Sequence, residues 1–146
     1  MDMSSRFRFT LLRCARLMSD EINTVLLPHQ LNYSLWQTLV ILHLNKDCTA
    51  LDIAKELSIS KPAVTKRLNH LTDLGCIQQI PLPDKRQKQL SLSEFGEQLF
   101  QECSQEIDDL EVELLKPFDR SELKQSHQFI SQLLNSLQHR KEPIHE

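Results

Sequence analysis

The chain has 146 residues, of which 40% are hydrophobic and 25% are charged, and its formal net charge at pH 7 is -3. This size and composition suit one soluble domain with appended helices, and the scarcity of glycine, which occurs twice, favours helices over a many-stranded sandwich. No run approaches the roughly 20 apolar residues of a membrane-spanning helix, and no signal-peptide pattern opens the chain, so we expect a cytoplasmic protein with no membrane partner.

The first third of the chain predicts two helices. Apolar residues recur every three to four positions from Phe7 onward, which indicates a long amphipathic helix that Pro28 ends. Ser34 is a candidate N-cap for a second helix, which runs to about Leu44. That helix is apolar on much of its surface, so we expect it at the centre of the core.

The segment from Thr49 to Leu92 carries the most informative pattern. A short helix begins at Thr49, and a tight turn at Ser58-Ile59 leads to another helix that Gly75 ends. Two strands follow over residues 76–82 and 88–92, joined by a polar tip over residues 83–87. This order predicts a winged helix-turn-helix, which places its second helix in the DNA major groove.

Local charge agrees with binding to a polyanion. Between Ser60 and Lys88 there are six basic and two acidic residues, a net charge of +4. Between Gln89 and Glu122 there are ten acidic and two basic residues, a net charge of -8. A basic segment beside an acidic body orients a small protein on DNA.

The second helix of the motif and the wing supply the candidate contacts. Lysine and arginine can contact phosphates and guanine, whereas serine, threonine and asparagine can read base edges. We expect the wing arginine to enter the minor groove and the wing aspartate to hold that arginine or backbone N–H groups in place. The alternative is a solvated helix face and a hydrophilic hairpin turn. The predicted DNA-binding residues are Ser60, Lys61, Thr65, Lys66, Arg67, Asn69, Asp84, Lys85, Arg86 and Lys88.

Two further helices complete the chain. Ser93 is a candidate N-cap for a helix that reaches about Leu115, and Ser121 opens a last helix that ends near His139. The first and last helices carry more apolar surface than the small winged unit can cover. Packing between two copies of the chain would bury it, at about 25 cal/mol per Å². The alternative is a helical bundle within one chain.

The whole pattern resembles the MarR family of bacterial transcription regulators. The resemblance is carried by Leu11-Leu12, by the segment 31–36, by the helix-turn-helix, by the wing Asp84-Lys85-Arg86 and by the segment 92–96. It implies a mainly α fold, a winged helix-turn-helix with a two-stranded wing plus N- and C-terminal helices that form a dimerisation region. Residues 1–146 then form a single MarR-like chain, with residues 31–97 binding DNA and residues 1–30 and 98–146 forming the dimerisation region.

The resemblance also implies a function. It predicts a sequence-specific homodimer, most often a repressor, that binds a pseudo-palindromic operator in double-stranded DNA and responds to a small aromatic or lipophilic effector. Phe9, Met18, His29 and Trp36 are candidate ligand-binding residues, although Met18 and Trp36 are also interpreted as core residues. Some relatives sense oxidation through a cysteine in the first helix, so Cys14, near Arg13 and Arg16, is an alternative sensor.

No other functional class has a motif of comparable strength. The sequence holds no Gly-rich phosphate loop, nucleophile elbow or zinc-protease motif, so we predict neither an enzyme nor a cofactor. Its four cysteines are widely spaced and give no metal-binding pattern. The remaining alternative is a winged-helix module that binds protein, which would not require the surplus of positive charge.

Overall fold

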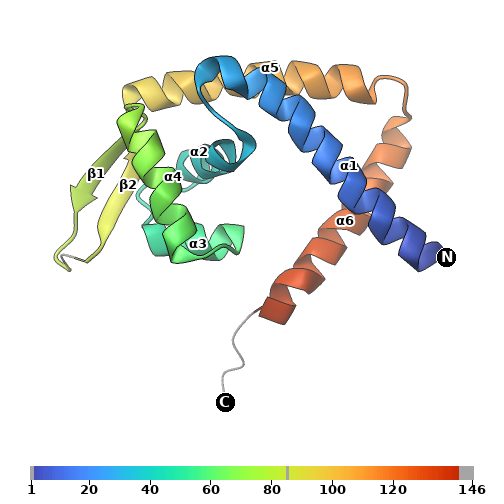
Figure 1. Cartoon of the computed structure of the whole chain (residues 1–146), viewed down its shortest axis with the longest axis horizontal. Coiled ribbons are helices and arrows are strands. Elements are labelled where there is room, and N and C mark those ends of the chain that lie inside the picture. Colours follow the sequence, from blue (N-terminus) through green and yellow to red (C-terminus); the bar gives the residue numbers. More distant parts are fainter. Residues whose placement is uncertain (1, 85, 142–146) are drawn as a thin grey trace. The chain divides into compact units, whose positions relative to one another are not determined.

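The computed structural model describes residues 2–84 and 86–141. Contacts divide the chain into two units, Met1–Asp108 and Asp109–Glu146. The fold is mainly α-helical, with a two-stranded wing (Figure 1). Within the described residues, no helix combines the length and the hydropathy needed to cross a bilayer.

The first helix, α1 (Met3–Leu26), is followed by a short 3-10 turn, η1 (Leu27–His29). The N-cap of α1 is Asp2, whose side chain accepts a hydrogen bond from the Ser5 backbone N–H. Pro28 lies at the start of η1, so α1 ends just before it, as the sequence predicts. Gln30 adopts a left-handed conformation (φ 63°) and ends this turn.

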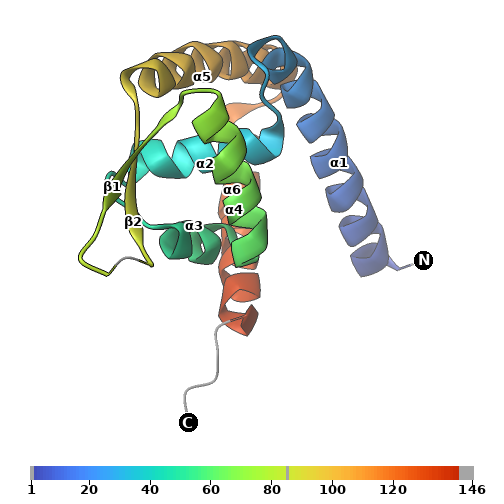
Figure 2. The ribbon, with the colours of Figure 1, turned by 60° about the vertical axis from the view of Figure 1, so that its left-hand side comes forward.

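Helix α2 (Tyr33–Leu44) is the centre of the core in the first unit. Leu39 is fully buried and Leu42 nearly so. Figures 1 and 2 both show α2 between α5 and α3. The prediction that Ser34 caps this helix is wrong, because the N-cap is Asn32, whose side-chain oxygen accepts from the Leu35 N–H at 2.9 Å.

Helices α3 (Ala50–Leu57) and α4 (Lys61–Asp73) form the helix-turn-helix. Thr49 and Asp52 make a reciprocal capping box at the start of α3, which satisfies two backbone N–H groups. Ser58 ends α3 with φ 55° and ψ 45°, so the turn bends through a left-handed residue that is not glycine. Gly75 (φ 80°) terminates α4, as predicted.

Strands β1 (Ile77–Pro81) and β2 (Lys88–Leu92) form an antiparallel hairpin, the wing (Figure 2). The pairing runs from Ile77 opposite Leu92 to Pro81 opposite Lys88. The first strand is therefore one residue shorter at each end than residues 76–82. Leu90 N–H donates to the Cys48 carbonyl at 2.8 Å, which ties the wing to the loop before α3.

Helix α5 (Glu94–Leu115) runs through the boundary of the two units, and α6 (Arg120–Lys141) lies in the second. The Ser93 hydroxyl accepts from the Gly96 N–H at 3.0 Å and donates to the Gly75 carbonyl at 2.6 Å, so Ser93 joins the start of α5 to the end of α4. Helix α6 begins one residue before Ser121, the predicted opening residue.

Candidate nucleic-acid interface

The two faces of α4 differ in burial and in chemistry. Val64 and Leu71 are fully buried and Leu68 is nearly so, which fixes one face of the helix against the core. The opposite face is polar and basic, and its side chains are exposed. Its exposed members are Ser60, Lys61, Thr65, Lys66 and Asn69.

The first turn of α4 is held by its own side chains. The Ser60 hydroxyl accepts from the Ala63 N–H at 3.3 Å, and the Thr65 hydroxyl donates to the Lys61 carbonyl at 3.1 Å. Pro62 occupies the first turn, where a missing N–H costs little. The Thr65 oxygen therefore retains acceptor capacity, while the ammonium groups of Lys61 and Lys66 extend from an ordered helix end.

Arg67 lies differently from the other predicted contacts. Its Nη1 donates to the Ser34 carbonyl at 3.1 Å and lies 3.5 Å from the Gln37 side-chain oxygen, both on α2. Burial lowers the pKa of the Arg67 guanidinium from its ordinary value. The sequence holds a signal for this placement, because Arg67 follows Val64 by three residues and precedes Leu71 by four, at the edge of the buried stripe.

The tip of the wing is built around Asp84. Its carboxylate accepts from the Arg86 backbone N–H at 3.1 Å, and its carbonyl accepts from the Gln87 N–H at 3.0 Å. The carboxylate thus holds a backbone N–H group of the tip. Arg86 and Lys88 are exposed, whereas Lys85 lies outside the described residues.

The wing is also connected to α4. The Gln79 side-chain amide donates to the Thr72 hydroxyl at 3.4 Å, and that hydroxyl donates to the Leu68 carbonyl at 2.7 Å. Together with the wing's bond to Cys48, this contact connects the basic hairpin to the helix-turn-helix within one unit of the chain. Docking on a duplex requires two basic elements to be held in such a fixed relation.

The four predicted ligand-binding residues have separate environments. Trp36 is in the core and stacks on Phe100 with ring centroids 5.1 Å apart. Phe9 and Met18 are exposed on α1, so the interpretation of Met18 as a core residue is wrong for this chain. His29 Nε2 lies 3.1 Å from the Glu106 carboxylate.

All four cysteines are free thiols, and only Cys14 among them is exposed. Burial raises the pKa of the Cys48 and Cys76 thiols. For Cys103, burial together with the nearby Glu106 raises the pKa to about 11. The described residues include no group of three or more metal-ligating side chains placed to hold an ion.

Comparisons with known proteins agree with this architecture. Residues 29–88 match a family model described as MarR family. Staphylococcus aureus MarR in complex with salicylate and kanamycin superposes with a TM-score of 0.85 at 22% identity, covering 92% of each chain. A mutant of E. coli MarR complexed with operator DNA gives 0.81 at 22%, covering 92% of this chain and 99% of that one. CouR from Rhodococcus jostii bound to p-coumaroyl-CoA gives 0.80 at 15%, covering 99% of both.

Proposed function

We propose that this chain, whose residues 29–88 match a MarR family model, is a transcription regulator of that family, a sequence-specific DNA-binding repressor that acts as a homodimer. The observation that carries the proposal is the exposed polar and basic face of α4 beside a basic wing, both fixed on one unit. A helix so placed can enter the major groove while the wing reaches the adjacent backbone or minor groove. The E. coli relative complexed with operator DNA supports this proposal.

The proposed DNA contacts fall into two classes. Lys61, Lys66 and Lys88 supply charge for phosphates, and Arg86 is placed on the exposed tip for the minor groove. Ser60, Thr65 and Asn69 are exposed polar groups for base edges. Asp84 orders the tip and is not a direct contact, since a carboxylate beside a phosphate is repelled. Residues 31–97 form the DNA-binding region in this proposal.

Exposed apolar side chains support the proposed dimer. In α1, Leu12 and Leu17 are 69% and 55% exposed, and in α6, Leu134 and Leu137 are 55% and 51% exposed. Large apolar side chains in such numbers are disfavoured on an isolated soluble chain. Residues 1–30 and 98–146 therefore form the proposed dimerisation region, and two copies would present two α4 helices to half-sites about 34 Å apart.

Regulation by a small molecule is the finer part of the proposal. The S. aureus neighbour is in complex with salicylate and kanamycin, and the R. jostii neighbour is bound to p-coumaroyl-CoA. We propose an aromatic or lipophilic acid as the effector class, with Phe9, Met18 and His29 as candidate contacts around α1 and η1. Trp36 is already packed on Phe100, so it would take part only from the core.

The test is fluorescence anisotropy with the duplex that lies upstream of the chain's own coding region, against a scrambled duplex, over a salt series. At least tenfold tighter binding to the native duplex, with two chains per site and a steep fall in affinity with salt, is the expected result. Absence of binding to either duplex at low salt would overturn the proposal and favour a module that binds protein. Leu134→Glu, which places a charge in the apolar face of α6, is expected to give a monomer in sedimentation and to abolish tight binding.

A further inference from the structure

The guanidinium of Arg67 is directed away from the exposed face of the recognition helix α4. It donates to the Ser34 carbonyl in the first turn of α2 at 3.1 Å, with Gln37 of the same helix 3.5 Å away. Its neighbour Lys66 is exposed, and no α2 contact holds it among the described hydrogen bonds. Two adjacent cationic residues of one helix thus have opposite surroundings.

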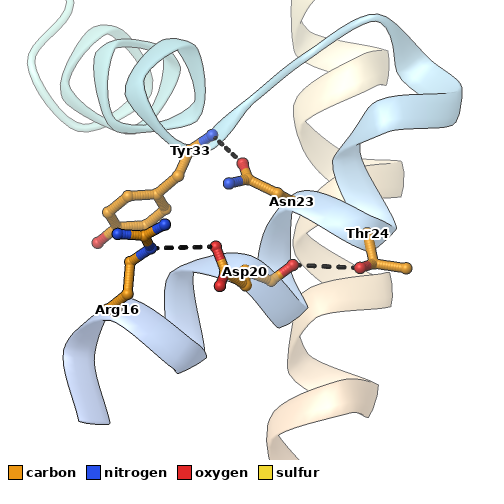
Figure 3. Close-up of polar contacts among 5 residues, drawn as sticks. All are labelled: Arg16, Asp20, Asn23, Thr24 and Tyr33. Atoms are coloured by element: carbon orange, nitrogen blue, oxygen red, sulfur yellow. Dashed lines mark hydrogen bonds and ion pairs between the residues drawn. The ribbon is translucent and has the colours of Figure 1, made fainter. Parts of the chain in front are cut away.

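The first turn of α2 is held from a second side by α1. The Tyr33 backbone N–H donates to the Asn23 side-chain oxygen at 2.7 Å (Figure 3). Asn23 lies one turn beyond Asp20, which forms an i,i+4 ion pair with Arg16 at 3.6 Å and whose carbonyl accepts from Thr24 (Figure 3). Tyr33 and Ser34 are consecutive, so one turn of α2 binds α1 through its N–H and α4 through its carbonyl.

We infer that Arg67 is a positioning residue, which fixes α4 to the first turn of α2, and that this turn couples the orientation of α4 to that of α1. The inference rests on the proposed function. It reassigns Arg67 from a predicted DNA contact to a group that acts through Ser34.

A charge-assisted hydrogen bond explains why arginine stands at this position. A guanidinium has several donors in a fixed plane, so it can bond the Ser34 carbonyl and lie against the Gln37 amide oxygen at the same time. Turning it toward a phosphate would break these contacts. Arg67 is therefore already bound before DNA arrives, unlike Lys66.

The coupling matters because a dimer reads two half-sites at a fixed spacing. If α1 belongs to the dimerisation region, the angle between α1 and α4 sets the separation of the two recognition helices. Specific binding needs both helices in register, whereas non-specific binding needs only phosphates near positive charge. Loosening the α2 turn should therefore reduce discrimination between sequences more than it reduces the salt dependence.

The experiment compares Arg67→Gln with Lys66→Gln in the full chain. Each variant loses one charge, and they differ by one position on α4. Affinity is measured on a random 30-base-pair duplex across a salt series and on the native upstream duplex at one salt concentration. The slope of log affinity against log salt is negative. For Lys66→Gln, we expect its magnitude to be smaller by about 0.9, the value for one lost phosphate contact.

For Arg67→Gln, we expect the same salt slope as in the wild type. We also expect the ratio of affinities for the native and the random duplex, which measures discrimination, to fall by about tenfold. Arg67→Lys, which keeps one charged donor, should recover part of that discrimination. A slope that falls as much for Arg67→Gln as for Lys66→Gln would overturn the inference, because it would show a phosphate contact. If Arg67→Gln does not fold, Gln37→Glu replaces it, because the new carboxylate should hold the Arg67 guanidinium against α2. An unchanged salt slope in Gln37→Glu would support the positioning role. A reduced slope would overturn it, because it would show that the guanidinium contacts a phosphate when DNA is bound.

Asn23→Ala tests the coupling through the same turn. This variant changes no charge, and we expect it to reduce discrimination with an unchanged salt slope. The double variant with Arg67→Gln should lose less than the product of the two single losses, because both substitutions loosen one element. An unchanged discrimination in Asn23→Ala would overturn the coupling.

Hydrogen exchange separates this inference from the proposed function. If the wild type binds neither duplex, the proposed function fails, but the contact of Arg67 with α2 can still be tested. Faster amide exchange across α4 in Arg67→Gln than in Lys66→Gln would support the positioning role without DNA. Equal exchange in the two variants would overturn that role as well.

Discussion

The Cys76 carbonyl occupies the space that a side chain on Gly96 would need. A Cβ built on Gly96 would lie 2.2 Å from the Cys76 oxygen. The same carbonyl accepts from the Ser93 N–H at 2.8 Å, so the chain entering the wing and the start of α5 are packed backbone against backbone. Glycine is required here by the close approach, since a Cβ at that distance cannot be accommodated without moving the backbone.

Gly96→Ala is therefore expected to lower the free energy of unfolding by about 3 kcal/mol, because the new methyl group forces the two backbones apart. Urea unfolding followed by the fluorescence of the single tryptophan, Trp36, would measure the loss. Gly75→Ala is the matched comparison. Its Cβ would meet only Phe95 at 4.0 Å, and its cost comes from φ +80°, which is worth about 1–2 kcal/mol. Equal losses in the two variants would contradict the steric argument.

Ser58→Gly should stabilise the protein. Ser58 has φ 55° at the end of α3, and its N–H bonds the Ala54 and Lys55 carbonyls. Glycine adopts this conformation without the penalty of a Cβ, and part of that gain is lost through the greater freedom of glycine in the unfolded chain. We expect a net gain of about 0.5–1 kcal/mol in chemical denaturation. Thr49→Gly, at the start of the same helix, removes a capping hydroxyl and should not stabilise.

Most of the fold could be predicted from the sequence because its signals are local. The start of a helix at Thr49, the terminating Gly75 and the cap of α5 at Ser93 follow from residue type and spacing, and the structure confirms each of them. The prediction that Ser34 caps α2 was wrong for a physical reason. Asn32 and Ser34 are both good caps, and the choice depends on Tyr33, whose N–H is bonded to Asn23 of another helix.

The candidate site was harder to predict because side-chain direction depends on tertiary contacts. Arg67 and Lys66 are adjacent and both cationic, yet only Arg67 reaches the carbonyl of Ser34, 33 residues away in the sequence. The packing of Trp36 on Phe100 joins helices that periodicity treats separately. Similarly, helical spacing shows that Met18 lies on an apolar stripe, but the spacing does not show whether the same chain covers it.

The thiols should react at very different rates. Cys14 is exposed on α1, whereas Cys48, Cys76 and Cys103 are buried with raised pKa values. Because the thiolate is the reactive form, a disulfide reagent at pH 7.5 should label one thiol per folded chain quickly and the other three only on unfolding. Cys14→Ser should remove the fast phase. Rapid labelling of more than one thiol in the folded protein would contradict the burial of the other three.

Alkaline pH should destabilise the protein through Cys103. Burial and Glu106 raise its pKa from 9.0 to about 11 in the folded chain. A raised pKa means that the folded state holds the proton more tightly, so this contribution is fully present below pH 9 and is lost as pH rises toward 11. Unfolding free energies of the wild type and Cys103→Ala between pH 8 and 11 would measure the difference. The variant is expected to be less stable at pH 8 because of its cavity, but to lose less stability with pH.

Arg86→Ala should weaken DNA binding and reduce its salt dependence, because the variant removes a cation from the minor groove, where the negative potential of DNA is enhanced. The two Asp84 variants separate charge from hydrogen bonding at the same tip. In the wild type, the Asp84 carboxylate accepts from the Arg86 backbone N–H at 3.1 Å. Asp84→Asn keeps a side-chain oxygen that can accept this hydrogen bond. It also removes a negative charge from the tip of the wing, so the affinity for DNA should rise. Asp84→Ala also removes the acceptor and leaves the tip unordered, so its affinity should be below that of Asp84→Asn. Anisotropy on the native upstream duplex would rank them. An unchanged affinity and slope in Arg86→Ala would show that the wing does not contact DNA, because an exposed arginine beside a duplex cannot be removed without loss of charge attraction.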